Sequence, residues 1–73
     1  MKRITLRQLR VFEQVARLRS VSAAAGVCHL TQPAVSMQLK ALEAECQLPL
    51  TEQVGRQLRL TEAGEAVALY ARR

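Results

Sequence analysis

Apolar side chains recur every three or four residues near the start of the chain, and polar residues fill the positions between them. This spacing predicts an amphipathic helix. Thr5 precedes the stretch and Gln8 follows three residues later, so their side chains can satisfy each other's backbone N–H groups in a capping box. A first helix is therefore expected to begin after Thr5, with an apolar face made of Leu6, Leu9, Phe12, Val15 and Ala16.

The middle of the chain predicts two further helices joined by a very short connection. Ser20 and Ser22 are candidate N-caps for an alanine-rich segment that runs to Cys28. Thr31 is the expected cap of the next helix, and Pro33 fits its first turn, where a missing N–H costs nothing. Because the connection is so short, the third helix must turn sharply from the second, which makes a helix-turn-helix. Its expected buried stripe is Val35, Leu39, Leu42 and Cys46.

Residues 48–60 lose the helical period and have turn composition around Gly55. Short stretches that can pair flank this turn, so the segment predicts a small β-hairpin. Arg59 alternates with Leu58 and Leu60, so we expect the arginine to point outward while its neighbours face the core.

A fourth helix is expected from Thr61 to the end of the chain, where no stop signal interrupts it. The segment therefore reads as cut within a helix. Together the elements predict a mainly α fold of winged helix-turn-helix type, with a three-helix core, a β-hairpin wing and a C-terminal helix. At 73 residues, the chain has room for a single small domain.

Charge is unevenly distributed along the chain. The net charge is +5, which favours an anionic partner such as nucleic acid or an acidic membrane surface. The cations concentrate in residues 1–20, whereas Ser20 to Leu39 carries no formal charge. The start of the third helix must therefore act through shape and hydrogen bonds, beside a basic surface.

The two cysteines, Cys28 and Cys46, are too few for a secreted disulfide scaffold, and a reducing cytoplasm is the expected location. No apolar run approaches the ~20 residues of a membrane span. Cys28 and His29 are neighbours whose side chains diverge, and no CxxC pair supports a zinc site. We interpret the thiols as buried and structural, with a redox-sensing role of Cys28 as the alternative, and His29 as a solvated or helix-capping residue. No set of residues indicates catalysis.

The opening turn of the third helix has small, uncharged side chains and the free N–H donors of a helix N-terminus. Gln32 can read the N6 and N7 edge of adenine, Ser36 suits base edges or phosphate, and Pro33 or Ala34 can meet a thymine methyl. These properties point to a DNA major groove. The alternative is that the small residues mark a buried helix end, but the basic hairpin beside them favours the groove.

The residues also resemble a known family over nearly the full chain. The segments that carry the likeness are LRQLRVFEQVA, SVSAAAGVCHLTQPAVSMQLKALEAE and LPLTEQVGRQLRLTEAGE, in that order. They resemble the N-terminal DNA-binding domain of LysR-type transcriptional regulators. The resemblance implies a winged helix-turn-helix domain over residues 1–60, with the helix-turn-helix at about 21–40 and the wing at about 50–60. Residues 61–73 would begin a dimerising linker helix.

The resemblance further implies a bacterial, nucleoid-associated regulator that is not an enzyme and binds double-stranded operator DNA as a homodimer. A tetramer is plausible for the full-length protein. The C-terminal effector domain that would take a small-molecule inducer is absent from this chain, and no cofactor is expected. By position, the DNA-binding residues would be Thr31, Gln32, Pro33, Ala34, Ser36, Met37, Lys40, Arg56 and Arg59, and the dimerisation residues would be Val67, Leu69 and Tyr70.

Several positions depart from the family pattern. Met37 stands where arginine is usual, which removes a guanine reader or phosphate contact. Gln47 replaces a glycine after the third helix, so a residue with a side chain must take a left-handed conformation there. Thr51 and Gln53 replace a large apolar residue and an arginine in the wing, and Gly26 lies inside a helix, where it costs about 1 kcal/mol against alanine.

Two other classes of function compete with operator binding. A winged-helix interaction module could use the same basic face for an acidic protein or a membrane surface. A purely dimerising helical fragment would suit the fourth helix but leaves the arginines of the hairpin unexplained.

Overall fold

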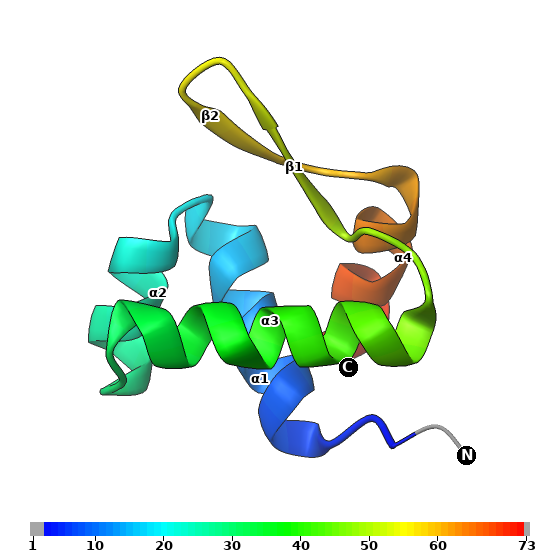
Figure 1. Ribbon diagram of the computed structural model, residues 1–73, viewed down its shortest axis with the longest axis horizontal. Helices are drawn as coiled ribbons and strands as arrows, with labels where there is room; N and C mark the ends of the chain where they lie inside the picture. The colour runs from blue at the N-terminus through cyan, green and yellow to red at the C-terminus, as the bar shows by residue number, and fades with distance from the viewer. Residues whose placement is uncertain (1–2, 73) are drawn as a thin grey trace.

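Residues 3–72, which this computed structural model describes, form four helices and one antiparallel hairpin (Figure 1). This confirms the predicted mainly α, winged helix-turn-helix architecture. The elements in chain order are α1 (Leu6–Leu18), α2 (Val21–Cys28), α3 (Gln32–Cys46), β1 (Thr51–Val54), β2 (Gln57–Leu60) and α4 (Glu62–Ala71).

Every helix begins at a serine or threonine whose side-chain oxygen accepts a backbone N–H three residues later. These caps are Thr5, Ser20, Thr31 and Thr61, with N–O distances of 3.0–3.2 Å. The capping box at α1 is complete, because the Gln8 side chain also accepts from the Thr5 N–H at 3.0 Å. Of the two candidates for α2, Ser20 is the cap. The predicted starts are therefore confirmed.

α1 lies at the centre of the fold and packs against α2, α3 and α4 (Figure 1). Adjacent faces of α1 serve two apolar clusters, because neighbouring helical residues point about 100° apart. Phe12 lies in a cluster with Leu42 and Leu50, and Val15 lies in another with Val35. Alanines at α2 complete the second cluster, and their small side chains let the helices approach closely. The buried stripe of α3 is as predicted, except that Cys46 is half-buried.

The hairpin turns at Gly55, which has a φ of 62° at the first position of a two-residue loop. Primed hairpin turns need this left-handed conformation, and glycine adopts it without a steric penalty. Leu58 and Leu60 are half-buried and each packs against one of the two core clusters, whereas Arg59 is exposed. The predicted alternation is confirmed, and β2 ties the wing to the helical core.

The base of the hairpin is held by polar contacts that the hydrophobic pattern does not reveal. The Glu43 carboxylate, on α3, accepts from the backbone N–H groups of Leu50 at 2.8 Å and Thr51 at 3.4 Å. The Thr61 N–H donates to the Leu50 carbonyl at 3.0 Å, and its hydroxyl donates to the Pro49 carbonyl at 2.7 Å. α3, the wing and α4 are therefore joined at one junction.

Three helices end at a residue in the left-handed conformation: Arg19, His29 and Gln47, with φ between 54° and 59°. The strained backbone expected at Gln47 is confirmed. His29 is the exposed C-cap of α2, as one interpretation of the sequence held. Because its N–H donates back to the end of α2, the short connection turns the chain into α3 without an irregular loop.

Candidate nucleic-acid interface

The outward face of α3 is exposed and made of the residues that the sequence singles out. Met37 and Pro33 lie two residues from Val35, about half a turn away, and so opposite the buried stripe. Met37 is 70% exposed. Thr31, Gln32, Pro33 and Lys40 are also exposed, whereas Ala34 and Ser36 are half-buried. The alternative interpretation, a buried helix end, is therefore wrong for this helix.

The opening turn of α3 has little backbone left to offer a phosphate. The Ala34 N–H donates to the Thr31 hydroxyl at 3.2 Å, and Pro33 has no N–H. In the described part of the chain, the Gln32 N–H is then the one amide of this turn without an acceptor. Side chains, rather than free backbone N–H groups, are therefore the main hydrogen-bonding groups that this helix end offers to a ligand.

Exposed cations without a salt bridge are present on α3 itself and on the hairpin, among the described residues. Within residues 3–72, Lys40, Arg56 and Arg59 are exposed and make no salt bridge or side-chain hydrogen bond. Because no carboxylate forms a salt bridge with them, their charge is available to an anion. Glu52 is the cross-strand partner of Arg59 in the hairpin register, so it lowers the net positive charge on that side of the wing.

The structure adds Arg19 to the wing arginines. A groove of about 710 Å³ between β2, α4 and the end of α1 is lined by Arg19, Arg56 and Arg59, with Glu65 as its carboxylate. Arg19 Nε donates to the Ala16 carbonyl at 3.0 Å, which holds the guanidinium close to the end of α1. Sequence spacing did not reveal this neighbourhood, because Arg19 and the wing are almost forty residues apart.

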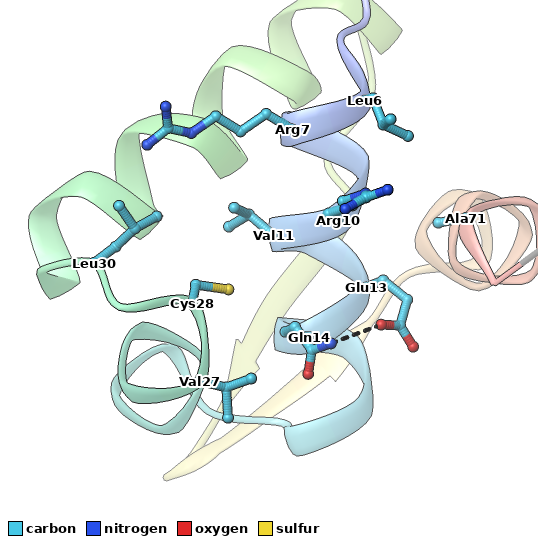
Figure 2. Close-up of a pocket in the computed structure, with 10 residues that line it drawn as sticks. All are labelled: Leu6, Arg7, Arg10, Val11, Glu13, Gln14, Val27, Cys28, Leu30 and Ala71. Atoms are coloured by element: carbon cyan, nitrogen blue, oxygen red, sulfur yellow. Dashed lines mark hydrogen bonds between the residues drawn. The ribbon is translucent and has the colours of Figure 1, made fainter.

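The other cations of α1 lie elsewhere. Arg7 and Arg10 line a second groove of about 680 Å³, between α1 and the end of α2, together with Leu6, Val27 and Ala71 (Figure 2). Beyond this groove Arg17 is held by its own helix, with Nη2 2.6 Å from Gln14 Oε1 and Nε 3.9 Å from Glu13 Oε2.

Both cysteines are half-buried, not buried as expected from the sequence. Cys28 lines the groove of Figure 2, and Cys46 packs at the edge of the Phe12 cluster. Among the described residues, no group of three or more His, Cys, Asp or Glu side chains could hold a metal ion.

α4 presents two large apolar residues to solvent: Leu69 is 52% exposed and Tyr70 is 68% exposed. Val67, predicted beside them at a dimer seam, is half-buried and packs against the Phe12 cluster of its own chain. No helix in residues 3–72 has the length and hydropathy to cross a bilayer.

Comparison with known proteins identifies the family. Residues 6–65 match the model for bacterial regulatory helix-turn-helix proteins of the lysR family. The chain belongs to the lysR family. The resemblance seen in the sequence is thereby confirmed.

Relatives in this family are much longer than the present chain. The RuBisCO operon transcriptional regulator of Allochromatium vinosum is 56% identical over 69 residues, which cover 94% of this chain and 23% of that protein. CfxR of Cupriavidus necator, an HTH-type transcriptional regulator, is 49% identical over 73 residues, covering 100% of this chain and 23% of the relative. The chain therefore spans less than a quarter of these lysR-family relatives.

A solved structure with the same fold contains DNA. The complex of the CbnR DNA-binding domain with DNA superposes with a TM-score of 0.87 at 40% identity, over 93% of this chain and 78% of that one. The present chain is thus similar, over nearly its whole length, to a domain that was crystallised in complex with DNA.

Proposed function

We propose that this chain is the sequence-specific DNA-binding domain of a bacterial transcriptional regulator, with α3 in the major groove and the hairpin on the flanking backbone. One observation carries the proposal. The outward face of α3 is solvent-exposed, and the described residues Lys40, Arg56 and Arg59 are exposed cations without a salt bridge, in a chain of the lysR family.

The residues of α3 divide into two roles by their chemistry. Gln32 is exposed at the start of the helix and its amide matches the donor and acceptor of adenine in the major groove. Thr31 and Ser36 can donate to a base edge or a phosphate, and Pro33 and Ala34 offer apolar surface. Lys40, two turns after Gln32, has only its ammonium to offer and suits a phosphate.

The arginines of the wing supply attraction without sequence preference. Arg56 is at the turn of the hairpin and Arg59 points outward from β2, so both can meet the phosphates beside the groove that α3 enters. Such contacts fix the register of the domain on the duplex, and each releases condensed counterions.

Pairing of two chains through α4 fits the same function. Leu69 and Tyr70 form an apolar surface on a helix that its own core does not cover. Two domains related by a twofold axis would read a dyad-symmetric operator. For the longer protein to which such a domain would belong, we propose an effector domain that binds a small-molecule inducer. We also propose assembly into dimers or tetramers and a cytoplasmic location, without a membrane partner.

The decisive test of this function is selection of bound duplexes from a random pool at about 150 mM salt. We expect a twofold-symmetric consensus, because two copies of α3 would contact equivalent half-sites. Recovery of unrelated duplexes without a consensus would contradict the proposal and favour a basic module for acidic proteins or membranes.

Salt titrations on the selected duplex then test the wing. Arg56→Ala should weaken binding to all sequences and lower the slope of log K against log salt by about one unit per chain. Arg17→Ala is the matched control, because Arg17 is already engaged by Gln14 and Glu13 and should leave the slope unchanged. Equal slopes in all three proteins would refute the role given to the wing.

A further inference from the structure

We infer that Met37 reads the C5-methyl group of a thymine, at a position in the opening two turns of α3 where no arginine or lysine is present to read guanine. The inference rests on the proposed function and specifies which base the outward face of α3 selects. It starts from an unusual surface residue, a methionine 70% exposed at the centre of that face.

The position of Met37 makes it the most prominent side chain of the face. It lies two residues from both Val35 and Leu39, so it is about half a turn from the buried stripe in either direction. Pro33 is one turn earlier on the same line. A DNA groove that accepts the start of α3 would therefore contact the Met37 side chain. Met37 is not one of the core residues.

The chemistry of the surrounding face excludes the common guanine readers. Arginine and lysine donate to guanine O6 and N7, but the first cation along α3 is Lys40, in the third turn. The exposed residues before it are Gln32, Pro33 and Met37. Glutamine pairs with adenine, whereas proline and methionine have no donor and favour an apolar partner.

The thymine methyl is the apolar group that the major groove displays. A methionine side chain is unbranched and polarisable, so it adapts its shape to such a group without needing a fixed angle of approach. Contact with the methyl would also remove from water the apolar surface that the free domain exposes at Met37. Contact with a thymine methyl is therefore favourable for this helix face, and the exposed Met37 side chain is positioned to make it.

The test replaces thymines of the selected duplex with deoxyuridine, one at a time, since deoxyuridine lacks only the C5-methyl. For the wild-type chain, we expect one thymine in each half-site whose replacement weakens binding by about fourfold, the factor that corresponds to burial of one methyl-sized group. For Met37→Ala, the same replacement should have almost no effect. Fluorescence titrations with the two proteins and two duplexes form a double-mutant cycle.

Two further variants test whether the thymine preference belongs to Met37 alone: a control at Lys40 and a change of specificity at Met37. Lys40→Ala should weaken binding to both duplexes while the factor between thymine and deoxyuridine stays near fourfold, because Lys40 faces phosphate. Met37→Arg should change the base selected from a random pool at that position from thymine to guanine. Thermal unfolding should be the same for Met37→Ala and the wild type, since the side chain is outside the core.

The outcomes separate this inference from the proposed function. If the wild type binds a symmetric consensus but tolerates deoxyuridine at every position, the reading of Met37 is overturned and operator binding stands. A sensitivity that persists unchanged in Met37→Ala would also overturn it, by assigning the methyl contact to another residue such as Pro33. Absence of any consensus would instead remove the proposed function.

Discussion

Gly26 and Gly64 both lie inside helices, and alanine at the two sites should change stability in opposite directions. Helix propensity alone favours alanine at each position by about 0.8–1.0 kcal/mol. At Gly26, a Cβ would meet no atom within 4 Å and φ is not positive, so nothing opposes that gain. We expect Gly26→Ala to stabilise the domain by about 1 kcal/mol.

At Gly64, the structure leaves no room for a side chain. An added Cβ would lie 2.0 Å from the Leu50 carbonyl oxygen and 3.3 Å from the Leu60 Cβ. The carbonyl cannot move away freely, because it accepts the Thr61 N–H at 3.0 Å. Overpacking costs 1–3 kcal/mol and occasionally more, and a backbone obstacle belongs at the upper end. We therefore expect Gly64→Ala to lose about 3 kcal/mol, a large part of the roughly 4–11 kcal/mol available to a domain of this size.

Urea unfolding followed by circular dichroism at 222 nm measures both variants against the wild type. A 1 kcal/mol change shifts the melting temperature of a domain this small by about 4–8 °C, so heating scans give an independent reading. Wild-type stability for Gly64→Ala would refute the close approach of α4 to Leu50. A loss of stability for Gly26→Ala would show that the exposed side of α2 is not open.

Two further substitutions test the ends of the elements that flank the wing, each by urea unfolding. Gln47→Gly should stabilise the domain by about 0.5–1 kcal/mol, because relief of the left-handed strain at a φ of 59° exceeds the extra chain freedom that glycine loses. A neutral result would show that the Gln47 side chain compensates its backbone. Glu43→Ala should cost about 2 kcal/mol and Glu43→Gln less, because glutamine keeps an acceptor but loses the charge. A Glu43→Gln variant as stable as the wild type would refute a charge-assisted bond.

Much of the fold could be predicted from the sequence because it follows from local rules. The helix starts are fixed by Ser and Thr caps, and the helix faces by apolar spacing. The hairpin follows from Gly55 between alternating residues. These signals act over a few residues, so they can be recognised in the sequence without knowledge of the tertiary contacts.

The junction of α3, the wing and α4 could not be predicted in this way. Glu43 looks like an ordinary charged residue of an amphipathic helix, yet it accepts amides seven and eight residues away. Glycine has a low helix propensity, so Gly64 looks unfavourable in the sequence. The structure explains it, because a side chain at this position would collide with the Leu50 carbonyl. Arg19 was missed for the same reason, because its position near the wing arginines depends on where the end of α1 lies relative to β2. Each role needs a partner that no local pattern specifies.

The exposed face of α3 was predictable as a surface, but its base preference required the position of each side chain. Val35, Leu39 and Leu42 hold the helix to the core, and none of them reaches the outward face. Residues such as Gln32 and Met37 contribute little to folding and are therefore free to vary with the operator. If Met37 reads thymine as inferred above, exchanging it for arginine would change the selected base, while the junction at Glu43 would keep helix and wing in the same relative position. Under the proposed function, specificity and stability would be separated in this domain, because the proposed base-reading residues and the core residues lie on opposite sides of one helix.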